Sequence, residues 1–244
     1  MEFQTIHFEI RTGRIGIITL NRPEKRNAIS IQMRREISAC LKKWWDSQEV
    51  GILIFTGSGN AFSAGFDLEE FNQPALYGEL YETSSTYHRD ICYFPKPTIA
   101  AVNGPAMAGG FDLIQLCDLR ICSQKASFAH PEIKFGIPPL FTPLRWIVGN
   151  ALARDLCLTG RIIDAKEAHR VGLVSEIVEG DRLLERAVQI AAGIMEAPLS
   201  VLQFTKSYLV GNVNRGFEES FCIEHDKVFQ GYLLKKASES LKPK

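Results

Sequence analysis

The sequence has no long hydrophobic run and no excess of charge of either sign. None of its apolar stretches approaches the ~20 residues that a membrane-spanning helix requires, although 45% of the 244 residues are hydrophobic. Lys plus Arg and Asp plus Glu both number 28. Proteins that bind nucleic acid or anionic membranes usually carry a basic excess, so the composition favours neither kind of partner.

Signals for metal ions, disulfides and secretion are also lacking. The six cysteines include no Cys-x-x-Cys pair, and the five histidines show no spacing typical of metal ligands. Most cysteines stand in apolar surroundings, which predicts buried, reduced thiols in a cytoplasmic protein. The first ten residues, MEFQTIHFEI, lack the basic and then apolar layout of a secretory signal.

Common nucleotide and nucleophile motifs are incomplete. The stretch GSGNAF begins like a dinucleotide-binding fingerprint but has Phe62 where the third glycine belongs. The stretch AFSAG is similar to a serine nucleophile elbow, but Ser63 stands several residues beyond the preceding strand rather than on a sharp turn. We therefore discount both a dinucleotide-binding fingerprint and a serine nucleophile at these stretches.

The order of apolar patterns predicts an α/β core. Buried strands are expected at 13–20, 51–59, 96–104 and 118–123, with a helix that begins after Ser30 and another over 75–93. The proline-rich segment 128–143 is expected to be a loop, and helical patterns dominate after residue 144. We predict an α/β core over residues 1–195 and a helical region over residues 196–244.

Two stretches place very small residues directly before a helix. They are NGPAMAGGFD (103–112) and NAFSAGFDLEEF (60–71). Small residues let a ligand oxygen approach the free backbone amides of a helix start, where the helix dipole adds about half a positive charge. The N–H groups of Phe66 and Gly109 are the candidates for a pair of donors to one oxyanion. Close packing of helix against strand would also require small residues at these positions.

Two carboxylates are separated by enough chain for the backbone to leave the site and come back to it. Asp112 is near the start of the helix after the small residues, and Glu132 lies in HPEIKFG. Facing each other across a cavity they would form an acid–base pair. Each alone has a simpler explanation, since acids are common in a first helical turn and on loops. His130 is expected to make a structural hydrogen bond.

The chain resembles the crotonase superfamily, the enoyl-CoA hydratase/isomerase family. The resemblance covers about residues 5–210, and five segments in order carry it: LNRPEKRNAIS, AFSAGFDL, KPTIAAVNGPAMAGGFDLIQLCDLRI, FAHPEIKFGI and LTGRIIDAKEAHRVGLVSEIV. It implies a spiral of ββα units with a C-terminal helical trimerisation region. It also implies homotrimers or dimers of trimers, acyl-CoA substrates of the kind used in fatty acid metabolism, and no cofactor beyond the coenzyme A of the substrate.

The resemblance assigns residues to the site. Phe66 and Gly109 match the two amides that stabilise a thioester enolate in the family, and Glu132 matches one of two catalytic glutamates, while Asp112 stands in place of the other. The matching coenzyme A contacts are Lys25, Arg26, Ala28, Ala64, Asp67 and Leu68.

The leading functional hypothesis is an enoyl-CoA hydratase, which adds water across a 2-enoyl-CoA double bond. Because Asp112 is one methylene shorter than glutamate, an enoyl-CoA or dienoyl-CoA isomerase is the alternative, and a coenzyme A-binding homologue without catalysis is a third. The segment GIPPLFTPLRW (136–146) is expected to line the acyl pocket and to suit an apolar, ring-sized group, although core packing explains its large residues equally well.

Overall fold

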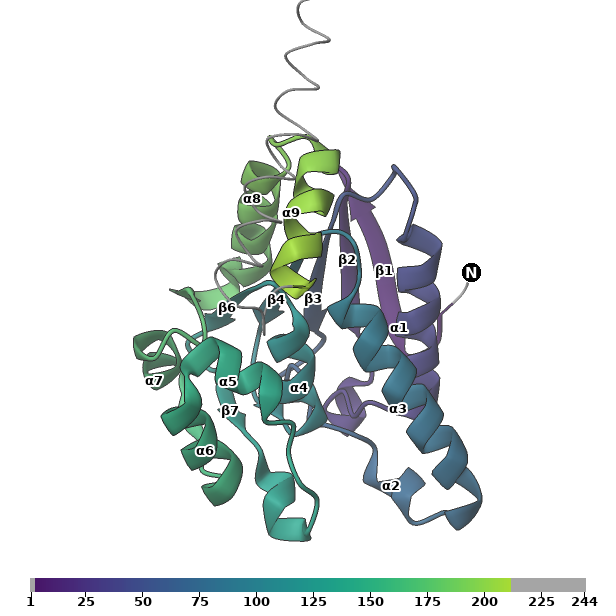
Figure 1. Ribbon diagram of the computed structural model, residues 1–244, viewed down its shortest axis with the longest axis vertical. Coiled ribbons are helices and arrows are strands. Elements are labelled where there is room, and N and C mark those ends of the chain that lie inside the picture. Colours follow the sequence, from purple (N-terminus) through teal and green to yellow (C-terminus); the bar gives the residue numbers. More distant parts are fainter. Residues whose placement is uncertain (1–2, 212–244) are drawn as a thin grey trace, which may run out of the picture.

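The computed structural model describes residues 3–211, and a six-stranded sheet forms its centre (Figure 1). The strand order is β1-β2-β3-β4-β6-β9. β1 and β2 form an antiparallel hairpin, and the other neighbours are parallel. The strands are β1 (Ile6–Arg11), β2 (Ile15–Leu20), β3 (Ile52–Gly57), β4 (Thr98–Val102), β6 (Leu119–Ser123) and β9 (Glu176–Val178).

A second, three-stranded sheet has the order β5-β7-β8. Its strands are very short: β5 (Ala106–Met107), β7 (Ser127–Ala129) and β8 (Ile163–Asp164). β5 and β7 are parallel, and this pairing fixes the end of the small-residue turn 103–108 against β7.

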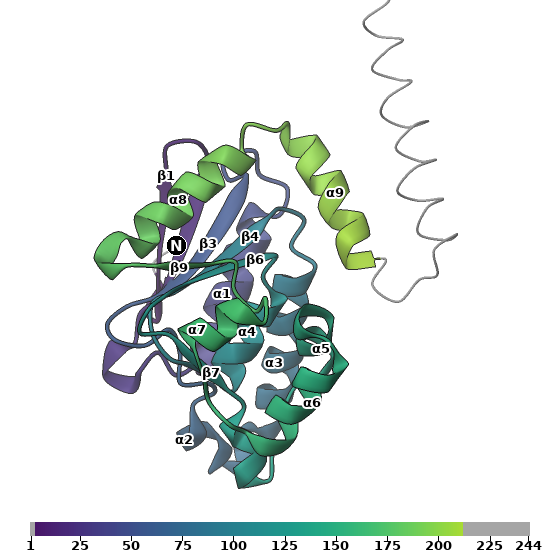
Figure 2. The same cartoon turned by 90° about the vertical axis from the view of Figure 1, so that its left-hand side faces the viewer.

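Helices cover both faces of the large sheet. In Figure 2, α8 crosses one face while α1, α3 and α4 lie on the other side. No single helix among residues 3–211 is long and apolar enough to cross a membrane; α8 and α9 pass that test of length and composition only as a pair bent by 103°. The helices are α1 (Ile31–Trp44), α2 (Leu68–Phe71), α3 (Tyr77–Cys92), α4 (Gly109–Leu116), α5 (Thr142–Val148), α6 (Asn150–Thr159), α7 (Ala165–Arg170), α8 (Leu183–Ile194) and α9 (Leu199–Gly211).

The alternation of strand side chains divides the core into two parts. Ile15, Ile17, Ile52 and Ile54 point to one face of the sheet and pack with the buried face of α8. The residues that alternate with them, such as Leu53 and Phe55, point to the opposite face and join the larger core under α1, α3 and α4. The strands are therefore apolar on both faces, as their continuous hydrophobic runs predict.

The parallel order of β3 and β4 explains why the two small-residue stretches meet. Each stretch follows directly on one of these neighbouring strands, and the carboxyl ends of parallel strands lie at the same edge of a sheet. The turn after β3 therefore lies beside the turn after β4. Met107 N–H donates to the carbonyl oxygen of Ser63 at 2.9 Å and joins the two turns directly.

The proline-rich segment 128–143 is more regular than the sequence predicted. Pro131 begins a short 3-10 helix (Pro131–Phe135), and Pro143 lies in the first turn of α5. Both positions tolerate proline because the first turn of a helix does not need its N–H groups for internal hydrogen bonds. The prediction of a loop through residue 143 was wrong for this reason.

The predicted helical region 196–244 lies largely outside the described residues, which include only α9 from it. α9 is attached to the core by Lys206, whose side chain is 4% exposed. Its ammonium donates to Asp118 Oδ2 at 2.8 Å and to the carbonyl oxygen of Lys96 at 3.0 Å. Asp118 in turn accepts hydrogen bonds from the backbone and hydroxyl of Thr98 at the start of β4.

Candidate active site

The two turns approach each other so closely that glycine is required at two positions. Gly65 has a φ of +95°, and a Cβ there would lie 2.8 Å from Ala108 Cβ and 3.2 Å from the backbone nitrogen of Gly109. A Cβ on Gly109 would lie 2.7 Å from Phe66 Cδ1. Any larger residue at either position would push the turns apart.

The backbone N–H groups of Phe66 and Gly109 are both unpaired within residues 3–211. Ile29 N–H donates to Gly65 O at 2.8 Å and Asp67 N–H donates to Ile29 O at 3.2 Å. In this parallel bridge the N–H of Phe66, between the two bonded residues, points away from Ile29. Gly109 is the first residue of α4, where an N–H has no acceptor within the helix.

Ala108 forces the chain into α4 with an unusual backbone conformation. Its φ of 48° and ψ of −125° lie in a region that L-residues rarely adopt. The conformation is held from both sides, because Ala108 N–H donates to Ala129 O at 3.0 Å and Ala108 O accepts from Asp112 N–H at 2.9 Å. Backbone strain of this kind costs about 1–3 kcal/mol and is found mainly at functional sites. Here it determines where the first N–H of α4 points.

Two carboxyl groups converge on His130 beside this turn. Asp112 lies three residues after Gly109, and therefore on the same side of α4. Glu132 lies in the short 3-10 helix after β7. His130 Nδ1 is 2.8 Å from Glu132 Oε1 and 4.0 Å from Asp112 Oδ1. The His130 side chain is 0% exposed, and the two carboxyl side chains are 11% and 13% exposed.

Gln115 determines which nitrogen of His130 carries the hydrogen. Its amide nitrogen lies 3.1 Å from His130 Nε2, one turn of α4 beyond Asp112. With the amide donating to Nε2, the ring carries its hydrogen on Nδ1 and donates it to Glu132 Oε1. The structural hydrogen bond expected for His130 is thus made, and its acceptor is one of the two predicted acids.

Each of the two acids keeps one buried oxygen without a partner among the described residues. These atoms are Asp112 Oδ1 and Glu132 Oε2. Buried polar atoms are rarely unsatisfied, so such atoms point to a substrate or a water. Burial, together with the neighbouring Glu132, raises the pKa of Asp112 well above its ordinary value. Burial therefore favours the protonated form of Asp112, which suits it to donate a proton.

Arg34 supports the aromatic ring of Phe66 and was not identified from the sequence. Its guanidinium carbon lies 4.6 Å from the centre of the Phe66 ring, and the side chain is 0% exposed. It also donates to Ile29 O at 3.2 Å, next to the bridge that orients Phe66. The only signal in the sequence is an arginine between Met33 and Ile37 on the apolar side of a predicted helix.

The predicted coenzyme A contacts lie on one surface beside Phe66. Ala64 N–H donates to Arg26 O at 2.9 Å and ties the two segments together. Leu68 is 64% exposed, and Lys25 forms an exposed ion pair with Glu69 at 2.6 Å. Ala28 lies in the same loop as Lys25 and Arg26, directly after Arg26 and Asn27, whose φ angles are both positive.

Asp67 has a structural role in this surface. It accepts from Arg22 at 2.9 Å and caps the start of α2 through the N–H of Glu69. Its side chain is therefore already occupied, which the sequence did not indicate.

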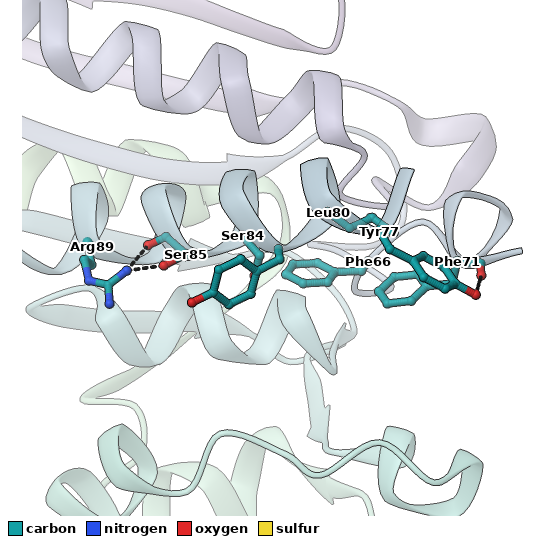
Figure 3. Close-up of a pocket in the computed structure, with 8 residues that line it drawn as sticks. Phe66, Phe71, Tyr77, Leu80, Ser84, Ser85 and Arg89 are labelled. Carbon is teal, nitrogen blue, oxygen red and sulfur yellow. Dashed lines mark hydrogen bonds between the residues drawn. The ribbon is translucent and has the colours of Figure 1, made fainter. Parts of the chain in front are cut away.

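A cavity of about 660 Å³ opens beside Phe66 (Figure 3). Its walls come from α2, α3 and the turn before them, and most of the wall area is apolar. None of residues 136–146, which we expected to line the acyl pocket, lines this cavity. Phe66, Phe71, Tyr77, Leu80, Tyr81, Ser84, Ser85 and Arg89 line it; we call it the ring-lined cavity.

Other candidate groups have structural explanations. Ser63 Oγ donates to Asn27 O at 2.8 Å and accepts from Gly65 N–H at 3.2 Å, so it holds the turn in place. Cys40, Cys92, Cys117, Cys122 and Cys157 are free thiols. Among the described residues, no group of three or more His, Cys, Asp or Glu side chains is placed to hold a metal ion.

Comparison with known proteins identifies relatives along almost the whole chain. A family model described as enoyl-CoA hydratase/isomerase matches residues 11–241. A Mycobacterium bovis protein named "Probable enoyl-CoA hydratase echA8" is 39% identical over 223 residues, which are 90% of this chain and 85% of that protein.

Solved structures are similar over the same length. The crystal structure of an enoyl-CoA hydratase from Bacillus anthracis aligns with a TM-score of 0.89 at 27% identity, over 99% of this chain and 98% of that one. A crystal structure from Thermobifida fusca YX, solved in complex with CoA, aligns with a TM-score of 0.85 at 29% identity, over 96% of this chain and 95% of that one.

Proposed function

Since the chain belongs to the enoyl-CoA hydratase/isomerase family and is an enzyme of that kind, we propose that it adds water to a 2-enoyl-CoA with Asp112 and Glu132 as its acid–base pair. The fold that the relatives share is the crotonase fold. The residue roles that follow are inferred from the geometry of the site.

The thioester oxygen is bound by two backbone amides. The N–H groups of Phe66 and Gly109 lie in touching turns and have no acceptor among the described residues. When water adds to the β-carbon, negative charge moves onto the thioester oxygen, and these donors meet it there. One donor of this kind is worth about 2.7–4 kcal/mol of transition-state stabilisation.

The carboxyl pair handles the water and its protons. A water between Asp112 Oδ1 and Glu132 Oε2 would satisfy both unpaired oxygens. Glu132 takes one hydrogen of this water as the oxygen attacks the β-carbon. Asp112, kept protonated by burial, gives its proton to the α-carbon of the enolate. One proton then passes from Glu132 to Asp112 and restores the pair.

The observation that carries this proposal is the convergence of two unpaired carboxyl oxygens beside the free N–H of Gly109. Loss of the absorbance of the conjugated thioester of crotonyl-CoA tests it. We expect turnover by the wild type and a loss of about 100- to 10,000-fold in kcat for Glu132→Gln. No turnover of any conjugated enoyl-CoA, or full activity of Glu132→Gln, would reject it.

An isomerase is the second candidate because Asp112 holds a proton and can return it to a different carbon. Isomerisation leaves the mass of the acyl-CoA unchanged, whereas hydration adds one water. Mass spectrometry of the product therefore separates the two reactions. Binding of acyl-CoA without either product would instead indicate a homologue that binds coenzyme A and has lost its chemistry.

Coenzyme A binding, assembly and location complete the proposal. The family and the relative solved with CoA support a bound acyl-CoA, and the exposed cations Lys25 and Arg26 suit its phosphates. We propose a homotrimer or dimer of trimers, which light scattering would test. The free thiols of the described cysteines suit a cytoplasmic enzyme of fatty acid metabolism, and cell fractionation would test the location.

A further inference from the structure

We propose that the ring-lined cavity selects an acyl group that carries an aromatic or alicyclic ring close to the reacting double bond. This inference rests on the proposed function, because it places the acyl group from the position of the thioester oxygen. It goes further by naming the chemical class of the substrate.

The position of Phe66 links the cavity to the reaction. The backbone of Phe66 supplies one of the two proposed donors to the thioester oxygen, and its side chain forms part of the cavity wall. Phe66 is the one lining residue that also belongs to the proposed catalytic groups, and we place the acyl chain on this side of the thioester, so that it enters the cavity past Phe66. The predicted coenzyme A contacts Lys25 and Arg26 lie on the chain segment before α1, which does not line the cavity.

The walls of the cavity are made of rings rather than aliphatic chains. Four of its lining residues are aromatic, and Leu80 is its one aliphatic side chain. The rings of Phe66 and Phe71 stack with their centres 6.4 Å apart and 21° between their planes. Figure 3 shows these two rings beside each other next to α3. Tyr77 Oη donates to Phe71 O at 3.2 Å and fixes the connection between α2 and α3.

Two of these rings are largely exposed to solvent, and a bound ligand would cover them. Tyr77 is 54% exposed and Tyr81 is 74% exposed. They lie four residues apart on α3, so they are neighbours on one face of the helix. Aromatic groups prefer partners whose centres are 4.5–7 Å away, and each such pair contributes about 0.5–1.5 kcal/mol beyond burial alone. A ring on the substrate would supply these partners.

The length of the apolar section argues against a long aliphatic chain. Tyr77 and Tyr81 are separated by about 6 Å along the helix axis, at 1.5 Å per residue. Beyond them the wall becomes polar, with Ser84 and Ser85 followed by Arg89. Arg89 donates to the backbone oxygen and hydroxyl of Ser85, at the far end of the row in Figure 3. A chain longer than one ring would leave apolar contact and meet hydroxyl and guanidinium groups.

Binding of saturated thioesters tests the inference without any chemistry. Titration calorimetry would compare 3-phenylpropanoyl-CoA, butanoyl-CoA and octanoyl-CoA. We expect 3-phenylpropanoyl-CoA to bind at least about 5-fold more tightly than octanoyl-CoA. Phe71→Leu and Tyr81→Leu should each lower the affinity ratio of 3-phenylpropanoyl-CoA to butanoyl-CoA by about 3- to 10-fold, which is the value of one lost aromatic pair.

Tyr93→Leu is the matched control, because Tyr93 is a 57% exposed ring directly after α3 that does not line the cavity. It should leave the affinity ratio unchanged. Equal or tighter binding of octanoyl-CoA, or an unchanged ratio in both cavity variants, would overturn the inference.

Turnover should be measured in the dehydration direction, with 3-hydroxy-3-phenylpropanoyl-CoA as substrate. The hydration direction is unfavourable for this compound, because adding water to its alkene removes the conjugation between the double bond and the phenyl ring. The α-hydrogen and the β-hydroxyl leave as water, and the conjugated product absorbs. We expect faster turnover than with 3-hydroxyoctanoyl-CoA. If only 3-hydroxybutanoyl-CoA and 3-hydroxyoctanoyl-CoA react, the inference fails while the proposed function stands. If ring thioesters bind preferentially but no thioester reacts, the proposed function fails while the cavity selectivity stands.

Discussion

His130 holds Glu132 in place, and two substitutions distinguish the contacts of its two ring nitrogens. Asn at position 130 places an amide nitrogen near the position of Nδ1, where it can still donate to Glu132. Gln places its amide further out, near Nε2, where it can meet Gln115 but not Glu132. Because the ring is 0% exposed, no water from bulk solvent replaces a lost donor.

The distances give the size of the effect. The Nδ1 to Oε1 contact of 2.8 Å is a hydrogen bond to an acid, worth about 1.5–3 kcal/mol when the acid is charged. If that energy is what keeps Glu132 aligned, His130→Gln should lower kcat by about 10- to 100-fold at about 1.4 kcal/mol per tenfold. His130→Asn should retain most of kcat. KM should change little in both, since His130 is not one of the predicted coenzyme A contacts.

The assay is hydration of crotonyl-CoA between pH 5 and 9, together with the midpoint of thermal unfolding for each variant. A structural defect would affect both variants and would lower the unfolding midpoint in parallel with kcat. A loss of Glu132 alignment would lower kcat in His130→Gln but not in His130→Asn, and it would change the pH profile of kcat only in the Gln variant. Equal kcat for all three proteins would refute the role assigned to His130.

Three further results are expected. Asp112→Asn should lower kcat by about 100- to 10,000-fold. It should also stabilise the protein relative to the wild type, increasingly as pH rises above ~4, because the raised pKa makes the folded state keep a proton on Asp112 that the unfolded chain releases. Thermal unfolding of both proteins from pH 4 to 8 checks the sign of this difference. Gly109→Ala should move the Phe66 ring and lower kcat by about 100- to 1000-fold, while Gly193→Ala, whose Cβ would meet nothing within 4 Å, should keep full activity. Lys206→Met should lower the free energy of unfolding by about 2 kcal/mol in urea titrations, because the lost bond is to a charged, only partly buried Asp118.

The main-chain part of the site could be predicted because its causes are local in the sequence. Small residues after two apolar strand patterns indicated turns with free amides, and parallel strands bring such turns to one edge. The structure brings the turns of Phe66 and Gly109 into contact, with both amides unpaired among the described residues. Asp112 was selected because it lies near the start of the helix and its spacing from Glu132 lets the two acids face each other.

The side-chain environment could not be predicted, since it depends on contacts between distant segments. Nothing near Gln115 in the sequence indicates that it meets His130, fifteen positions later. Tyr77 and Tyr81 belong to the helix predicted over 75–93, but their place in a cavity wall depends on Phe66 and Phe71 from another part of the chain. The large apolar residues of 136–146 suggested a pocket, but Ile137 is 40% and Leu140 is 39% exposed.

The shorter side chain at position 112 gives the two acids different roles. Asp112 Oδ1 stops 4.0 Å from His130 Nδ1, too far for a hydrogen bond, and so the ring's one hydrogen goes to Glu132. Glu132 is thereby held in one orientation, while Asp112 Oδ1 has no partner among the described residues and burial raises the pKa of Asp112. A glutamate at 112 would be long enough to compete for the same N–H. Because an acid–base pair needs one group that holds its proton and one that does not, the missing methylene is compatible with water addition as well as with isomerisation.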